Sequence, residues 1–204
     1  PSMGCTEPVA IGLAVSRTCE MLTTPATHLD MVISSNIFKN AYSVQIPNAG
    51  TNGIELSCAL GCVLSKPGNT MEIFANIQPA DVEKAKQLVA DGFVTVKVLP
   101  SSQFYIECIA TNDTERTHTI TEDAHDNMVY AEKNGEILTD KRVKGDVQTE
   151  QTTDFDITQY TFADFLDATE NVDIKELAFI KEGIDMNLEI AKIGLQKKYA
   201  IGIG

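Results

Sequence analysis

The sequence predicts an α+β fold, with helices at both ends around a mixed or antiparallel sheet that has a central β-α-β-β-β segment. Apolar residues recur every three or four positions near both ends of the chain, which is typical of helices. Between them lie short runs rich in Val, Ile, Thr and Tyr that predict strands, and Asn134 followed by Gly135 predicts a tight hairpin. Hydrophobic residues make up 43% of the 204 residues, enough for a sizeable core.

Residues 1–68 are predicted to form an N-terminal segment of helices and short strands that carries the cysteine and Asn/Lys motifs. Its first helix begins at Thr6 or Glu7, either of which can cap free amide groups, and Pro8 suits a first helical turn. The body of this helix is apolar on several faces, so we expect it to be buried. The elements predicted in this segment are a helix at 6–23, strands at 31–33 and 42–46, and a helix at 54–64.

Residues 69–139 are predicted to form an antiparallel α+β subdomain, and residues 140–204 a linker followed by C-terminal helices. From Leu177 to Leu195 an apolar stripe indicates an amphipathic helix, whose stripe we expect to be core. The elements predicted after residue 69 are a strand at 71–77, a helix at 79–92, strands at 93–98, 103–110, 117–121, 128–132 and 136–138, a loop at 140–160, a short helix at 162–166 and a long helix from 173.

The composition excludes several classes of protein. A net charge of −13 argues against a nucleic-acid partner, because phosphate contacts need clustered Lys and Arg. Apolar runs fall short of the roughly 20 residues of a membrane span, and a signal peptide is not visible. Five cysteines, an odd number, favour reduced thiols and a cytoplasmic location. The first residue is Pro and the last residues read YAIGIG, so we expect a piece of a longer polypeptide.

Cys5 stands at the predicted start of the first helix. The positive end of the helix dipole and nearby free amides lower the pKa of a thiol there and favour the thiolate. Such a thiolate could serve as a nucleophile or a metal ligand. The alternative is that a small residue simply fits the turn after Gly4.

The other four cysteines have simpler interpretations. Cys58 and Cys62 share one face of a predicted helix and could grip a metal, but small, soft Cys is also a common core residue. Cys19 and Cys108 lie within apolar patterns, which favours the core for them as well.

Several polar residues are candidates for binding a ligand. His125 precedes Asp126 and Asn127 in a polar group that could bind a ligand or could be a surface turn. Asn and Lys side chains offer hydrogen-bond donors that suit a small carboxylate, although Asn also supplies turn geometry. The residues of this kind gathered around the predicted strand pair are Asn36, Lys39, Asn40 and Asn48.

Five short stretches, taken together and in this order, resemble one known family: GCTEP at 4–8, SNIFKN at 35–40, PNAG at 47–50, GIELSCALG at 53–61 and AHDNM at 124–128. This family is the L-cysteine desulfidases and their relatives, which are similar to the α-chain of iron–sulfur L-serine dehydratases. The resemblance runs over most of the chain to about residue 140, and more loosely to its end.

The resemblance implies a lyase of amino-acid catabolism that removes hydrogen sulfide or water, with ammonia, from L-cysteine or L-serine to leave pyruvate. It further implies a 4Fe-4S cluster with one open iron, for which Cys5 would be one of three cysteine ligands rather than a nucleophile. Because Cys108 is the last cysteine, the remaining ligands would lie outside this chain, in a missing C-terminal half, and the fragment alone would be inactive. The substrate-binding residues implied are Thr6, Glu7, Asn36, Lys39, Asn40 and Asn48.

Three questions stay open at this level. The choice between cysteine and serine is not made, and the base for the α-proton is unassigned, with His125 a weak candidate because Asp126 stands where the family pattern has Thr. The alternatives to the lyase are a cluster-free enzyme with Cys5 as nucleophile and a non-catalytic module for small-ligand binding or dimerisation. The expected partners are a small amino acid, the missing half and a second copy in a homodimer.

Overall fold

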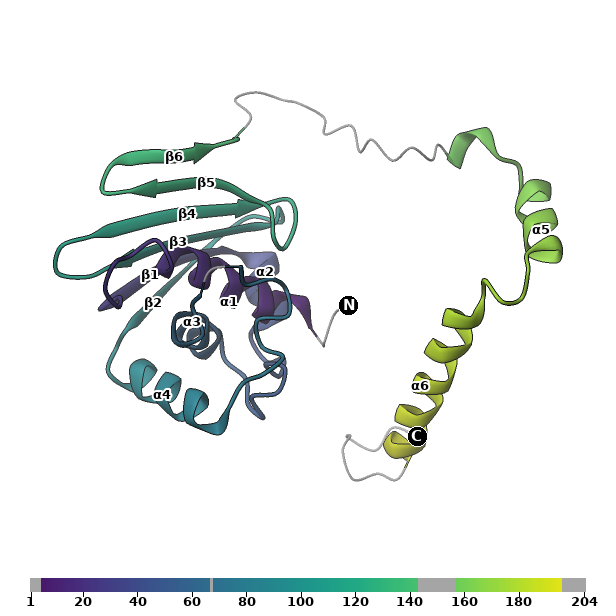
Figure 1. The fold of residues 1–204 in the computed structure, drawn as a ribbon, viewed down its shortest axis with the longest axis horizontal. Helices are drawn as coiled ribbons and strands as arrows, with labels where there is room; N and C mark the ends of the chain where they lie inside the picture. The colour runs from purple at the N-terminus through teal and green to yellow at the C-terminus, as the bar shows by residue number, and fades with distance from the viewer. Residues whose placement is uncertain (1–4, 67, 143–156, 196–204) are drawn as a thin grey trace. The chain divides into compact units, whose positions relative to one another are not determined.

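The chain divides into two compact units, Pro1–Asp146 and Val147–Gly204. The computed structural model describes residues 5–66, 68–142 and 157–195. The first unit holds a sheet covered by helices, and residues 157–195 of the second form helices and no strand (Figure 1). An α+β fold with helices at both ends is therefore confirmed.

The sheet has six strands in the order β2-β1-β3-β4-β5-β6. β1 runs parallel to β2 and antiparallel to β3, and all later pairs are antiparallel, so the sheet is mixed. The predicted hairpin is confirmed between β5 and β6, where Asn134 (φ 53°) and Gly135 (φ 87°) both adopt the positive φ of a tight turn. The strands are β1 (His28–Ser34), β2 (Val94–Leu99), β3 (Tyr105–Thr111), β4 (Arg116–Glu122), β5 (Met128–Lys133) and β6 (Glu136–Asp140).

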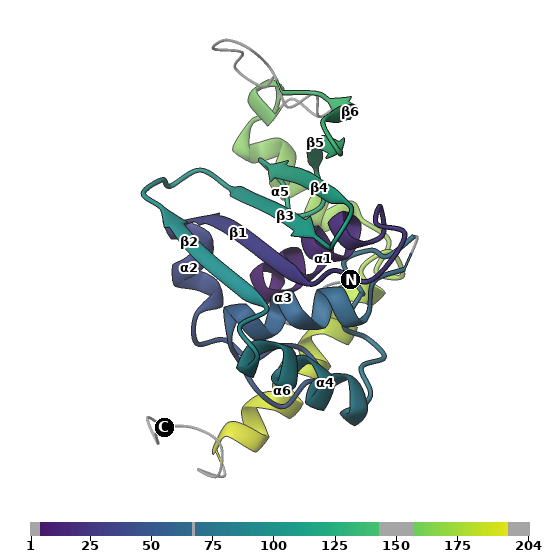
Figure 2. The same cartoon turned by 90° about the vertical axis from the view of Figure 1, so that its left-hand side faces the viewer.

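Helices cover one face of this sheet (Figure 2). α1 packs against β3 and β4, α3 packs against α1 and β2, and α4 packs against α3. The strands alternate accordingly, with Ile106, Cys108 and Ala110 of β3 buried and their neighbours along the strand only partly buried. The helices of this unit are α1 (Thr6–Cys19), α2 (Ser35–Ala41), α3 (Ile54–Val63) and α4 (Pro79–Ala90).

α1 and α3 approach each other closely at two glycines. A Cβ atom added to Gly61 would lie 2.8 Å from the Cα of Gly12, and one added to Gly12 would meet the ring of buried Phe74. The contact therefore depends on the absence of both side chains. Beyond the crossing, Ser65 Oγ donates to the Ser16 carbonyl at 2.8 Å.

The prediction of strands at 42–46 and 71–77 is wrong. Residues 35–41, for which no element was predicted, form helix α2. The segment after α2 makes only an isolated bridge between Gln45 and Asn52. Residues 71–76 form successive turns that bury Phe74 under α1. In both places apolar side chains are buried by tertiary packing, which produces the hydrophobic pattern of a strand without a ladder of backbone hydrogen bonds.

The segments predicted as 1–68 and 69–139 share one sheet, because β1 lies between β2 and β3. The predicted strand at 31–33 is confirmed as the middle of β1, and the predicted helices at 6–23, 54–64 and 79–92 are confirmed with slightly shorter bounds. Most of the predicted linker at 140–160 lies outside the described residues.

The second unit contains η1 (Ile157–Gln159), α5 (Phe162–Asn171) and α6 (Ala178–Leu195). α5 begins with a capping box in which Thr161 and Asp164 exchange side-chain to backbone hydrogen bonds. α6 starts later than predicted, and its apolar stripe is not core: Ile184 is 53% exposed and Leu188 is 52% exposed. The stripe has the spacing of a packed helix, but no residue of α5 or α6 is buried within the described ranges. No helix of those ranges is long and apolar enough to cross a membrane.

Candidate functional site

The first candidate site lies where α1 begins. Cys5 is the N-cap residue, with an extended backbone (φ −64°, ψ 129°). Its thiol lies 3.0 Å from Glu7 Oε2 and 3.8 Å from the Asn40 carbonyl oxygen. The thiol therefore acts as a hydrogen-bond donor within a polar group rather than as a cap for the helix.

Glu7 connects α1 to α2 at this site. The Asn40 side-chain amide, on the last turn of α2, donates to Glu7 Oε1 at 2.9 Å. The Thr6 hydroxyl donates to Glu7 Oε2 at 3.3 Å. The fold thus brings together four of the predicted site residues, Cys5, Thr6, Glu7 and Asn40, around one carboxylate.

Cys5 opens onto a pocket of about 520 Å³. The opposite wall is the loop that precedes α3, which includes Gln45, Pro47 and Asn48. Asn48 holds this loop in place: it adopts φ 60°, and its side-chain amide donates to the Phe74 carbonyl at 3.0 Å and to the Ala75 carbonyl at 3.3 Å. Its role in the structure is therefore to position the loop, although it also lines the pocket.

The electrostatics at Cys5 differ from the prediction. Burial and the hydrogen bond to the Glu7 carboxylate raise the pKa of Cys5, so the expectation of a lowered pKa is wrong. The negative charge of Glu7 adds to this effect, and the backbone amides of Thr6 and Glu7, which lower the pKa, do not offset these causes together. Burial alone would raise the pKa of Glu7, but hydrogen bonds from Cys5 and Asn40 keep it below its usual value. The pair is thus a protonated thiol donating to an ionised carboxylate.

The remaining candidates are placed elsewhere. Asn36 and Lys39 are exposed on α2, and no described contact joins either to the Cys5 thiol. His125 lies in the turn between β4 and β5, where its ring packs on Phe104 with centroids 4.8 Å apart. Arg17 holds the same turn by donating to the Asp126 carbonyl at 2.6 Å. These contacts account for His125 as part of a surface turn.

The described residues contain no group of three or more His, Cys, Asp or Glu side chains that could hold a metal ion. All five cysteines are free thiols. Cys58 is fully buried in the core and Cys62 is partly buried, so the two do not present a matched pair of metal ligands. Cys5 alone could contribute to a metal centre, as one ligand among others supplied from outside the described residues.

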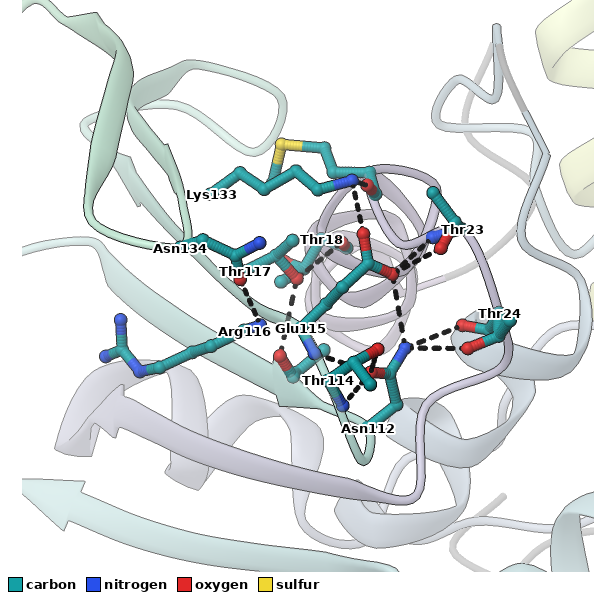
Figure 3. Close-up of polar contacts among 12 residues, drawn as sticks. Thr18, Thr23, Thr24, Asn112, Thr114, Glu115, Arg116, Thr117, Lys133 and Asn134 are labelled. Carbon is teal, nitrogen blue, oxygen red and sulfur yellow. Dashed lines mark hydrogen bonds and ion pairs between the residues drawn. The ribbon is translucent and has the colours of Figure 1, made fainter.

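A second polar cluster was not recognised in the sequence (Figure 3). The Glu115 carboxylate accepts hydrogen bonds from the Thr23 amide and hydroxyl, both at 2.7 Å, and forms an ion pair with Lys133 at 2.7 Å. Asn112 extends the cluster by donating to the carbonyl and the hydroxyl of Thr24. The cluster ties the loop after α1 to the β3–β4 turn and to β5. Its members come from three separate parts of the sequence, so no local pattern marks them.

The fold and the first site together define a class: an α+β unit with one protonated thiol facing a small pocket at a helix start. Among known proteins, the chain is similar over its whole length to a UPF0597 protein of Clostridium tetani, at 32% identity. It is also similar to a UPF0597 protein of Caldanaerobacter subterraneus at 34% identity and to one of Porphyromonas gingivalis at 29%. The chain spans about half the length of these curated relatives, 48% in each case.

No family model matches the chain. No solved structure matches it either. The relatives carry the UPF0597 name, so the resemblance to the L-cysteine desulfidases and the iron–sulfur L-serine dehydratase α-chain is wrong as an assignment of family. The five stretches are short, and their order alone did not distinguish the two families.

Proposed function

We propose that the chain is part of a lyase that eliminates hydrogen sulfide or water, together with ammonia, from L-cysteine or L-serine to leave pyruvate. The observation that carries this proposal is the Cys5 thiol, held by Glu7 and Asn40 and facing a pocket of about 520 Å³. A thiol next to a fixed carboxylate and a cavity of this size suits the binding of a small polar molecule.

The lining of the pocket supports a substrate with both charged and polar groups. Gln45 contributes a side-chain amide that can donate to a carboxylate, and the Asn48 side-chain oxygen can accept from an ammonium group, since the Asn48 nitrogen is bound to Phe74 and Ala75. Ile46 and Pro47 are buried and give the loop a rigid base. Lys39 is exposed on the neighbouring helix α2 and would add positive charge near an anionic substrate.

We further propose that Cys5 is one thiolate ligand of a 4Fe-4S cluster whose other ligands lie outside the described residues. When bound, such a cluster supplies a Lewis acid for the departing sulfur or oxygen. Ligation requires the thiolate, so binding at Cys5 would release the proton that the thiol donates to Glu7 Oε2, which lies 3.0 Å from the sulfur. Asn40 keeps the Glu7 carboxylate oriented beside the sulfur through its bond of 2.9 Å. Five unpaired thiols suit a reducing compartment such as the cytoplasm.

The test is an anaerobic preparation of the natural full-length protein, assayed for pyruvate with L-cysteine and with L-serine. The proposal expects pyruvate from at least one of them, and sulfide with the first. Cys5→Ser should lower both the iron content and the activity, whereas Glu83→Gln, an exposed carboxylate on α4, should change neither. Absence of pyruvate from both amino acids after cluster reconstitution would overturn the proposal.

The two alternatives give different outcomes in the same preparation. A cluster-free enzyme with Cys5 as nucleophile would turn over without iron and lose activity to iodoacetamide at Cys5 alone. The raised pKa of Cys5 disfavours this alternative, because a protonated thiol is a poor nucleophile. A binding module would retain its response to the amino acid in Cys5→Ser.

A further inference from the structure

A second pocket, of about 460 Å³, lies where α1 and α3 end beside α4. It does not include Cys5 or the loop that faces it. Two cysteines open onto it: Cys19 is the last residue of α1, and Cys62 is in the last turn of α3. The residues of its lining that matter for chemistry are Cys19, Cys62, Lys66, Lys84, Leu88 and Phe93.

The two thiols line the same pocket and differ in pKa. The neighbouring thiol of Cys19 is the largest cause that lowers the pKa of Cys62, with Lys84 contributing, and Cys62 in turn raises the pKa of Cys19. This difference favours Cys62 as the attacking thiol. Cys58 and Cys108, by contrast, are fully buried, and burial raises the pKa of Cys108 to about 12. Accessible thiols in this region are therefore confined to the pair that lines the pocket.

The positive charge at the pocket favours an anionic ligand. Lys66 and Lys84 bring two ammonium groups to the lining, and Glu20 brings one carboxylate. Burial raises the pKa of Glu20, and Arg17 opposes this shift. Two lysines thus face one carboxylate at the pocket. Leu88 and Phe93 supply apolar surface for a short hydrocarbon stem.

One wall of this pocket is held rigidly. Thr23 and Thr24 line it, and both are bound by the polar cluster of Figure 3. Glu115 fixes Thr23 and Asn112 fixes Thr24, so the loop after α1 is anchored to the sheet rather than free. The pocket is therefore built around the thiols by tertiary contacts, in addition to the two helix ends.

We propose that Cys19 and Cys62 form a thiol–disulfide exchange site for a small, carboxylate-bearing disulfide. The Cys62 thiolate attacks one sulfur of the bound disulfide, forming a mixed disulfide and releasing one thiolate, which takes a proton from water. Cys19 then attacks the Cys62 sulfur of that mixed disulfide and breaks its bond to the second half of the substrate, which leaves as a thiolate and takes the Cys19 proton. The substrate is reduced to two thiols, and the protein is oxidised to a Cys19–Cys62 disulfide that joins α1 to α3. Cystine and glutathione disulfide share this chemistry.

The test exposes the purified, fully reduced protein under anaerobic conditions to cystine, to glutathione disulfide and to neutral 2-hydroxyethyl disulfide, with peptide mapping by mass spectrometry. In the unaltered protein we expect a Cys19–Cys62 disulfide. Cys19→Ser should accumulate a mixed disulfide on Cys62, and Cys62→Ser should react at Cys19 at least tenfold more slowly. The faster of the two carboxylate-bearing probes shows whether the site prefers cystine or glutathione disulfide.

The role of charge is tested with a matched pair of lysines on α4. Lys84→Gln should slow the reaction with cystine and glutathione disulfide several-fold and leave the neutral probe unchanged, whereas Lys86→Gln, outside the pocket lining, should alter none of the three. Adducts on Cys5 with an unmodified Cys62 in the unaltered protein would overturn the proposal, as would equal rates in Cys62→Ser. The mapping of the unaltered protein decides the matter even if a variant folds poorly.

Discussion

Among single residues, the carboxylates of Glu7 and Glu115 act through the groups that surround them. Glu7 and Glu115 both have pKa values below the usual range because neighbours donate hydrogen bonds to the charged form. Burial and the Glu7 carboxylate together keep Cys5 protonated, so the pKa of this thiol is raised, whereas the sequence predicts that the helix dipole lowers it. The pKa shifts of Cys5 and Glu115 can therefore each be tested by replacing one carboxylate.

Glu7→Gln should make Cys5 react faster with iodoacetamide at pH 7.5. The substitution removes both the hydrogen bond to a carboxylate and the negative charge, each of which raises the pKa of Cys5. A fall of one pKa unit increases the thiolate fraction about tenfold, so we expect an increase of several-fold in rate. The rate is measured by mass spectrometry of the Cys5 peptide. Glu83→Gln serves as the control, and an unchanged rate in Glu7→Gln would show that Glu7 does not govern the thiol.

Glu115 should contribute to stability against acid. Its folded pKa is lowered to about 2, below the unfolded value of roughly 4.3, so the contribution is full above the unfolded pKa and is lost as pH falls toward 2. Its bond to Lys133 is the largest cause, followed by the hydroxyl and amide of Thr23. Urea unfolding at pH 6 and at pH 3 should therefore show a smaller loss of stability in Glu115→Gln than in the unaltered protein. Glu136→Gln, an exposed residue of β6, is the control and should behave like the unaltered protein.

At the scale of elements, the fold depends on how closely α1 and α3 approach. Their crossing at Gly12 and Gly61 leaves no room for a side chain at either position. The same approach brings Cys19 and Cys62 to one pocket, since both follow the crossing toward the ends of their helices. The helix contact and the proposed exchange site are thus two consequences of one packing arrangement.

Gly61→Ala should destabilise the first unit. The added methyl group would lie 2.8 Å from the Gly12 Cα, which is backbone and cannot rotate away, so the helices must separate. We expect a loss of about 1–3 kcal/mol in the free energy of unfolding, measured by urea denaturation. Gly183→Ala makes the same chemical change inside helix α6, where nothing lies within 4 Å of the added atom, and it should cause no loss. Equal stability of Gly61→Ala and the unaltered protein would contradict the proposed packing.

Across the chain, the two units differ in how many core residues they bury. The first contains every buried residue of the described core, while α5 and α6 contribute none. The second unit exposes large apolar side chains along α6, among them Phe179, Ile190 and Leu195. Stability of the sheet and its helices is therefore expected to reside within the first unit.

A protein shortened to residues 1–146 should fold on its own. Since no described core residue is removed, we expect its thermal midpoint, followed by circular dichroism, to match that of the 204-residue chain within a few degrees. The rate of Cys5 alkylation should also be unchanged, because Glu7, Asn40 and the facing loop are all retained. A disordered shortened protein would show that the second unit completes the core.

Much of the fold was predictable because it depends on residues that are close together in the sequence. The Asn134 and Gly135 turn predicts its hairpin from two residues, and Pro79 marks the first residue of α4. The candidate site was predictable only as a set of residue types, of which Cys5, Thr6, Glu7 and Asn40 meet and Asn36 and Lys39 do not join them. The wrong prediction of a strand at 71–77 has a physical cause. Phe74 packs against Gly12, which is distant in sequence, so the local pattern does not reveal why this residue is apolar.

Residues close together in the chain were enough to predict the α+β class, the positions of most helices and strands, and a cysteine where α1 starts. Folding was needed to show that this thiol is protonated, that Asn48 supports a loop, and that Cys19 and Cys62 share a pocket. The physical reason is that pKa values and cavities depend on groups brought within a few ångströms by folding, and most of those groups are distant in sequence.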